Sequence, residues 1–179
     1  MIKAIIFDMD GVICSSSYYI WKARNIYLHK YGVKIDNKEI SELLGRSLRD
    51  QLVVINNRHN LSIGFDEFSK KTREIQVKLM KNDGLKPCEG VKELIDDLLE
   101  NNIKIGLASS NLKKFILEDL EIIGLENKFK IITSVEEVTR HKPHPEIFLK
   151  TAEKLDIKPK NCVVIEDAVN GIEAAKKAI

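Results

Sequence analysis

The chain has 179 residues, of which 29 are lysine or arginine and 27 are aspartate or glutamate, so its formal net charge is only +2. This near balance gives no electrostatic reason to expect nucleic-acid binding. No segment approaches the roughly 18 apolar residues that a membrane span needs, and the start of the chain shows no signal-peptide pattern. We therefore expect a cytoplasmic protein without nucleic-acid or membrane partners, and the oligomeric state stays open.

The first predicted element is a buried strand over residues 2–7, a short isoleucine-rich run that ends at Asp-Met-Asp-Gly. Apolar residues at helical spacing then predict four helices without a convincing strand between them, over residues 18–31, 37–44, 47–60 and 66–82. Ser15, Ser16 or Ser17 can cap the first of these helices, and Gly32 can end it. We expect residues 15–85 to form a helical insertion.

The rest of the chain alternates between short apolar runs and helical patterns. Strands are predicted over residues 103–108, 130–133 and 162–165, and helices over residues 89–102, 112–123 and 147–155. Strands that alternate with helices favour a parallel sheet that is covered on both faces. The expected sheet domain therefore consists of residues 1–14 and 86–179, on either side of the helical domain at 15–85.

Polar residues follow each predicted strand, at the edge where open parallel sheets bind ligands. In chain order these are Asp8 and Asp10; Ser109, Ser110 and Asn111; Lys142; and Glu166 with Asp167. Four carboxylates at one edge cannot all stay ionised without a cation. Because no histidine or cysteine cluster accompanies them, the ligands are hard oxygens, and we expect Mg²⁺ bound by Asp8, Asp10, Glu166 and Asp167.

The remaining residues suit a phosphate group. Ser109, Ser110 and Asn111 offer polar side chains and free N–H groups at a helix start, and Lys142 adds a positive charge. Gly11 is predicted to belong to the same phosphate-binding set. With a metal present these are the parts needed for phosphoryl transfer. Asp8 would attack phosphorus and form an aspartyl-phosphate, while Asp10 would protonate the leaving oxygen and then take a proton from water.

Four motifs in this order resemble those of the haloacid dehalogenase-like hydrolases. They are Asp8-Met9-Asp10-Gly11-Val12, Ser109-Ser110-Asn111, Lys142-Pro143 with Pro145, and Glu166-Asp167 followed by Asn170-Gly171-Ile172. The chain is most similar to the subgroup with a helical cap, which includes β-phosphoglucomutase-like and phosphoglycolate phosphatase-like proteins. The resemblance implies a Rossmann-like α/β core with an inserted all-helical cap.

The resemblance also assigns roles to individual residues. It implies that Asp8 is the nucleophile, and that Asp10 is the acid/base and gives a backbone carbonyl to Mg²⁺. It further implies that Ser109 and Lys142 position the phosphate, and that Asp167, with Glu166 beside it, binds the metal. The stretch from Leu44 to Ser47 resembles the cap segment that reaches over the substrate, so Arg46 and Arg49 are candidate substrate-binding residues.

Two departures separate this chain from the mutases of the subgroup. Those proteins carry a histidine about where Ile20 stands and an arginine where Leu48 stands. The differences favour a phosphatase acting on a small phosphorylated metabolite, such as a sugar phosphate or a phosphoglycolate-like compound. A sugar-phosphate mutase is the first alternative.

A third departure concerns the end of the chain. Members of the subgroup usually continue for several tens of residues past the helix that starts near Asn170, and that segment supplies a fifth strand. We expect this strand to be absent here, which would leave the strand at residues 162–165 at an open edge. The second functional alternative is therefore a non-catalytic or truncated member of the fold.

Overall fold

The computed structural model describes residues 1–44 and 46–179. Gly45, which belongs to the predicted cap segment, lies outside the described residues. Four parallel strands form one sheet in the order β3-β2-β1-β4. The strands are β1 (Ala4–Phe7), β2 (Lys104–Ala108), β3 (Ile132–Thr133) and β4 (Cys162–Ile165). The predicted α/β fold with a parallel sheet is confirmed.

The register of the sheet brings the ends of its two central strands and β4 to one level. Phe7 at the end of β1 pairs with Leu107 of β2 on one side and with Ile165 of β4 on the other. Helices cover both faces of the sheet and bury most of β1 and β2, whereas in β4 only Cys162 is buried and Val163 is exposed. The residues that follow β1 and β4 therefore emerge side by side.

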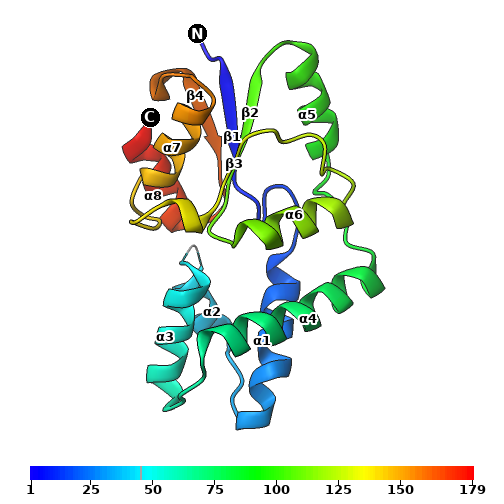
Figure 1. The fold of residues 1–179 in the computed structure, drawn as a ribbon, viewed down its shortest axis with the longest axis vertical. Coiled ribbons are helices and arrows are strands. Elements are labelled where there is room, and N and C mark those ends of the chain that lie inside the picture. The colour runs from blue at the N-terminus through cyan, green and yellow to red at the C-terminus, as the bar shows by residue number, and fades with distance from the viewer. Residues whose placement is uncertain (45) are drawn as a thin grey trace.

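Helices α5 (Val91–Glu100) and α6 (Lys113–Ile122) cover one face of the sheet, and α7 (Glu146–Lys154) and α8 (Val169–Ala178) cover the other (Figure 1). Each face has its own buried cluster. Phe7 and Leu107 pack with Ile95 of α5 on the first side. On the second side Ile6 packs with Phe148 of α7. The described residues also form three short 3₁₀ helices: η1 (His29–Tyr31), η2 (Val135–Glu137) and η3 (Pro159–Asn161).

Four helices lie together beyond the carboxyl ends of the strands, below the sheet in Figure 1. They are α1 (Ser17–Leu28), α2 (Asn37–Leu43), α3 (Leu48–His59) and α4 (Phe65–Asp83). We call them the four-helix group. They enclose a separate apolar cluster, and its fully buried members include Leu28, Ile55 and Phe68. Each helix thus buries its apolar stripe against the others.

Local signals in the sequence account for several helix ends. Ser47 caps α3, because its side chain accepts a hydrogen bond from the Asp50 backbone N–H. Gly32 follows η1 with φ +70° and Gly84 ends α4 with φ +67°, a region that favours glycine. The predicted strand at residues 2–7 is shorter in the structure, since Ile2 is exposed and the ladder begins at Ala4.

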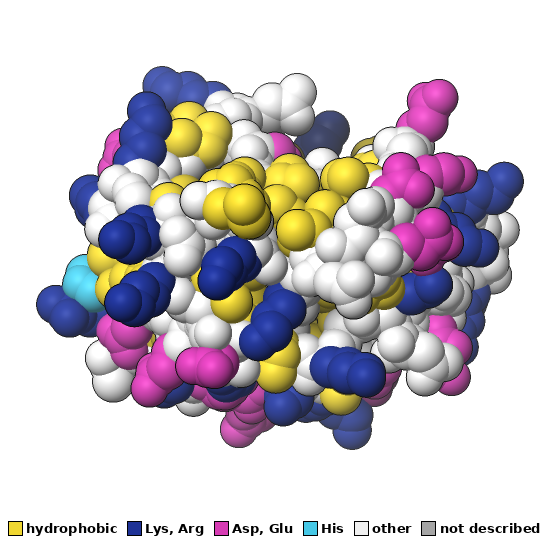
Figure 2. Space-filling view, turned by 90° about the horizontal axis from the view of Figure 1, so that it is seen from above, with side chains coloured by type: hydrophobic (Ala, Val, Ile, Leu, Met, Phe, Trp, Pro, Cys, Tyr) yellow, Lys and Arg dark blue, Asp and Glu magenta, His cyan; other side chains and the backbone are white. Residues whose placement is uncertain are grey.

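Strand β4 pairs with β1 and lies at an edge of the sheet. Figure 2 shows the molecule from above, at the end opposite the four-helix group. On that face Lys and Arg side chains mix with Asp and Glu around a central hydrophobic group, so neither charge dominates. Within residues 1–44 and 46–179, no helix combines the length and apolar character that a membrane span requires.

Candidate active site

Three carboxylates meet at the carboxyl ends of β1 and β4. Asp8 directly follows β1, and Glu166 and Asp167 directly follow β4. One oxygen from each of the three lies within 4.8 Å of the others. The three carboxylates lie close together because Phe7, the last residue of β1, pairs with Ile165, the last residue of β4. The residues that follow these two strands therefore start side by side.

Lys142 neutralises part of this negative charge. Its Nζ donates to Asp8 Oδ1 at 2.6 Å and to Glu166 Oε1 at 3.0 Å, and its side chain is only 2% exposed. Burial by itself lowers the pKa of Lys142, but the charges of Asp8 and Glu166 raise it, and the net pKa lies above the usual value. The ammonium group therefore stays charged between the two carboxylates.

Asp10 has a different set of partners. One of its oxygens accepts a hydrogen bond from Ser16 Oγ, and the other accepts from Asn111 Nδ2 at 2.7 Å. Burial, and then the negative charge of Asp8, raise the pKa of Asp10 to about 7, although the Ser16 hydrogen bond lowers it. A carboxyl group with this pKa can give and take a proton near neutral pH, as a general acid/base must.

Ser16 does not serve the role that its position suggests. It stands at the N-cap of α1, but its side chain makes no capping hydrogen bond. Its hydroxyl is fully buried and points to the Asp10 carboxylate instead. Sequence reasoning named Ser16 only as a candidate cap, so its contact with the predicted acid/base was missed.

The residues present fit a metal ion of hard character. Burial and the charge of Asp8 raise the pKa of Glu166 to about 7, with Lys142 opposing, and they also raise the pKa of Asp167. These shifts arise from carboxylates crowded in one place, and a bound cation would relieve them. All the donors are oxygens, the ligands that Mg²⁺ prefers. The group contains Asp8, Glu166 and Asp167, whereas the Asp10 side chain is held by Ser16 and Asn111.

Two glycines leave room for these carboxylates. A Cβ added at Gly11, which has φ +88°, would lie 2.1 Å from Asp167 Oδ2. A Cβ added at Gly171 would lie 1.4 Å from Glu166 Oε1. Only glycine therefore allows both acidic side chains to keep their positions. The sequence predicts Gly11 to be a phosphate-binding residue, and in the structure a Cβ at this position would meet the Asp167 side chain.

The serine motif after β2 divides into an inner and an outer part. Ser109 is fully buried, and its Oγ accepts a hydrogen bond from the Asn111 backbone N–H at 3.2 Å. Ser110 and Asn111 line the same cavity as Asp8, Asp10 and Lys142. Ser110 and Asn111 therefore contact the cavity directly. Ser109 stabilises the turn in which they lie.

This cavity, which we call the carboxylate cavity, lies between the sheet and the four-helix group and measures about 530 Å³. That volume is typical of small-molecule sites. Helix α1 contributes Ile20, Trp21 and Arg24 to its lining, and Arg46 and Leu48 come from the segment around the start of α3.

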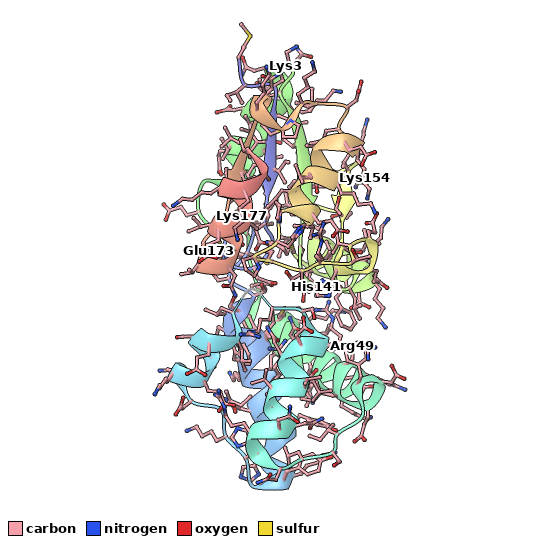
Figure 3. The ribbon with its side chains drawn as sticks, turned by 90° about the vertical axis from the view of Figure 1, so that its left-hand side faces the viewer. Lys3, Arg49, His141, Lys154, Glu173 and Lys177 are labelled. Atoms are coloured by element: carbon pink, nitrogen blue, oxygen red, sulfur yellow. The ribbon has the colours of Figure 1, made fainter. Side chains whose placement is uncertain are left out.

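Arg49 and His141 line a second cavity of about 1350 Å³, where the Arg49 guanidinium lies 3.9 Å from the centre of the Phe65 ring. Figure 3 shows Arg49 and His141 on facing sides of the junction between the sheet and the four helices. The structure therefore brings Arg46 to the carboxylate cavity, and Arg49 lines the neighbouring one.

Arg24 is a residue of the carboxylate cavity that sequence reasoning missed. It stands four residues after Ile20, so both side chains lie on one face of α1. Both line the cavity together with Asp10. The sequence does contain a signal for Arg24. Ile20 stands where the mutases that this chain resembles carry a histidine, and a residue one helical turn later lies on the same face of the helix.

Comparison with known proteins finds extensive similarity. A family model described as haloacid dehalogenase-like hydrolase matches residues 5–179. A phosphorylated carbohydrates phosphatase from Thermotoga maritima is 31% identical over 98% of this chain and 81% of its own length. A β-phosphoglucomutase from Bacillus subtilis is 34% identical over 98% of this chain and 80% of its own length. The crystal structure of a β-phosphoglucomutase from Clostridium difficile superposes with a TM-score of 0.88 at 36% identity, over 99% of this chain and 82% of that one.

Proposed function

We propose that this chain, which belongs to the haloacid dehalogenase-like hydrolase family, is a Mg²⁺-dependent phosphatase that hydrolyses a small phosphorylated metabolite. It is a phosphoric monoester hydrolase of this family, and relatives named as phosphatases support that class. The single observation that carries the mechanism is the separation of two aspartates. Asp8 is paired with Lys142, whereas Asp10 is held apart by Ser16 and Asn111 with a pKa near 7.

Each aspartate has one task in the proposed reaction. Asp8 attacks phosphorus and forms an aspartyl-phosphate, while the ester bond breaks and Asp10 gives its proton to the leaving oxygen. Asp10 then takes a proton from a water molecule, which attacks the aspartyl-phosphate, releases phosphate and restores Asp8. Lys142 offsets the negative charge that develops between the nucleophile and the phosphate. Mg²⁺ held by Asp8, Glu166 and Asp167 would further reduce the repulsion between these anionic groups.

The four-helix group is the proposed cap, with residues 15–85 as the cap domain and residues 1–14 and 86–179 as the core. Its position beyond the strand ends supports this division, because α1 closes one side of the carboxylate cavity. A cap in this place would exclude water and select the alcohol part of the substrate.

A sugar-phosphate mutase is the second candidate, and it is favoured by the similarity to two β-phosphoglucomutases. The side chains of the cavity favour the phosphatase instead. Ile20 and Leu48, which stand where the mutases carry a histidine and an arginine, both line the carboxylate cavity. Apolar side chains at these positions supply no hydrogen bond for the transfer of a phosphoryl group to a second hydroxyl.

Phosphate release from a panel of esters with Mg²⁺ tests the proposal. The panel contains sugar phosphates, phosphoglycolate and p-nitrophenyl phosphate. We expect turnover by the parent chain and a loss of about 10³-fold or more in Asp8→Asn, because the amide cannot form the covalent intermediate. Asp97→Asn, which changes an exposed aspartate of α5, is the matched control and should retain activity.

Removal of Mg²⁺ with a chelator should abolish turnover, and restoring Mg²⁺ should recover it. Equal activity of the parent chain and Asp8→Asn would contradict the aspartyl-phosphate mechanism. Turnover that appears only when a sugar bisphosphate is supplied, with the phosphoryl group moved to a second hydroxyl, would identify the mutase.

A further inference from the structure

Arg24 places a buried positive charge in the carboxylate cavity. The residue is only 6% exposed, and among the described residues its Nη1 has no hydrogen-bond partner. Its side chain lines the carboxylate cavity, as do Asp10 and Asn111. An arginine stays charged at neutral pH, and a buried charge that lacks a partner is strongly unfavourable. Its position in a cavity therefore points to a missing anionic partner.

The neighbours of Arg24 do not supply that partner. The guanidinium carbon lies 4.3 Å from the centre of the Trp21 ring, but stacking uses the face of the group and leaves its N–H donors available. Burial lowers the pKa of Arg24 to about 9, and only the charge of Asp10 raises it. Asp10 already accepts hydrogen bonds from Ser16 and Asn111 at its two oxygens.

The position of Arg24 indicates which part of a substrate it would meet. Lys142 is committed to Asp8 and Glu166, so the transferred phosphate would bind on that side of the cavity. Arg24 and Asp10 line the same cavity, and the negative charge of Asp10 raises the pKa of Arg24 against the effect of burial. Asp10 is the proposed proton donor to the leaving oxygen. Arg24 is therefore placed beside the alcohol part of the substrate.

We propose that Arg24 binds a second anionic group, either a carboxylate or a second phosphate, on the leaving alcohol of the substrate. This inference rests on the proposed phosphatase function and narrows its substrate class. Arginine is suited to the role because its planar group donates two parallel hydrogen bonds to a carboxylate or a phosphate. The cavity of about 530 Å³ has room for a small substrate of this kind.

Binding to the Asp8→Asn variant, in which the ligand is not consumed, tests the inference. Isothermal titration calorimetry in the presence of Mg²⁺ would measure the affinity of this variant for two matched pairs of ligands. Phosphoglycolate is paired with ethyl phosphate, which lacks the carboxylate, and glucose 1,6-bisphosphate is paired with glucose 6-phosphate, which lacks the second phosphate. We expect the ligand with the second anion to bind at least about 30-fold more tightly in one pair, and that pair names the anion.

Arg24→Met in the same background should reduce this preference to less than about 3-fold, because a buried charged contact is lost. Lys22→Met is the matched control, since Lys22 lines the same cavity from α1, but its side chain is 38% exposed and already lies 4.0 Å from Asp83. It should keep the preference. Arg24→Lys, which keeps the charge but not the paired donors, should retain part of it, and thermal unfolding checks that each variant is folded.

The inference is overturned if both ligand pairs bind equally to the Asp8→Asn chain, or if the preference survives in Arg24→Met. It is also overturned if Arg24→Met weakens both members of a pair by the same factor, as a merely structural residue would. Should Arg24→Met not fold, an unchanged preference in Arg24→Lys overturns it. Failure of the parent chain to hydrolyse any ester would instead contradict the proposed function, because the binding preference does not depend on turnover.

Discussion

At the scale of single residues, the carboxylate cluster depends on side chains that leave one another room. Lys142 reaches both Asp8 and Glu166 only if the Glu166 carboxylate stays where it is. The absence of a Cβ at Gly171 allows this, because a Cβ there would lie 1.4 Å from Glu166 Oε1. A glycine inside helix α8 disfavours the helix by about 1 kcal/mol relative to alanine, so its place is explained by the site and not by helix stability.

Gly171→Ala should therefore reduce phosphatase activity by about 10- to 100-fold, as is usual when a residue that supports a metal ligand is displaced. The substitution should leave the helix content unchanged or slightly raised, because alanine has the higher helix propensity. Steady-state kinetics with Mg²⁺ and circular dichroism measure the two effects. Glu173→Ala, at an exposed position of the same helix, is the control. Full activity in Gly171→Ala would show that the position of Glu166 is unimportant.

At the scale of elements, the loop that carries Lys142 is anchored on both sides. On one side Glu137 of η2 contacts Lys154, and Lys150 Nζ donates to the Glu137 backbone carbonyl at 2.6 Å. On the other side the Glu146 carboxylate, at the start of α7, accepts hydrogen bonds from the Thr139 backbone N–H at 2.9 Å and from the Arg140 backbone N–H. The loop between η2 and α7 is thus fixed by charges at its ends.

Glu137→Gln should make the stability of the protein less dependent on pH. Burial raises the pKa of Glu137, but Lys154 and the Ser134 N–H lower it, and the net pKa is below the usual value. A lowered pKa stabilises the fold at pH values above the unfolded pKa, and this contribution is lost as the pH falls through the folded pKa. We expect a loss of about 1 kcal/mol in the free energy of unfolding at pH 7, and a smaller loss near pH 3.

Urea unfolding of Glu137→Gln at the two pH values measures this difference. Glu100→Gln, which changes an exposed residue at the end of α5, is the control and should show no such trend. An equal loss at pH 7 and at pH 3 would mean that the Glu137 charge does not act through Lys154.

At the scale of the whole molecule, polar contacts of Arg73 and Asn170 join the four-helix group to the sheet domain. Arg73 of α4 contacts Glu118 and Asp119 of α6, each at 2.8 Å, and its side chain is only 7% exposed. Asn170 at the start of α8 donates its Nδ2–H to the Leu44 carbonyl at 3.0 Å. The proposed cap is therefore held to the core through different core helices, α6 and α8.

Arg73→Met should lower the free energy of unfolding by on the order of 3 kcal/mol, because it leaves Asp119 buried without its cation. Burial already raises the pKa of Asp119, with Arg73 opposing, so the carboxylate depends on this partner. Replacing Asp119 as well, in Arg73→Met/Asp119→Asn, should recover part of the loss. Chemical denaturation measures the free energy of unfolding of the parent chain, the single variant and the double variant. Lys71→Met, at an exposed position of α4, is the control and should change this free energy by less than about 0.5 kcal/mol. A double variant no more stable than the single one would argue against a coupled pair.

The sequence by itself determined the features that depend on neighbours along the chain. The apolar spacing predicted the helices and the parallel sheet, and turn chemistry predicted that a helix ends at Gly32. The order of polar residues after the strands was also readable, because parallel strands end at one edge whatever surrounds them. The assigned roles of Asp8, Asp10 and their neighbours remain predictions until activity is measured.

Only the tertiary structure decided which side chains meet across large separations. The Asn111 amide donates a hydrogen bond to Asp10, 101 residues away in the sequence. The Ser16 hydroxyl donates to the same carboxylate and does not cap its helix. Arg24 enters the carboxylate cavity, while Arg49 turns toward Phe65 in the neighbouring one. A local pattern fixes the face of a helix on which a residue lies, but its partner is set by how that helix packs on distant segments, and that information is not contained in local spacing.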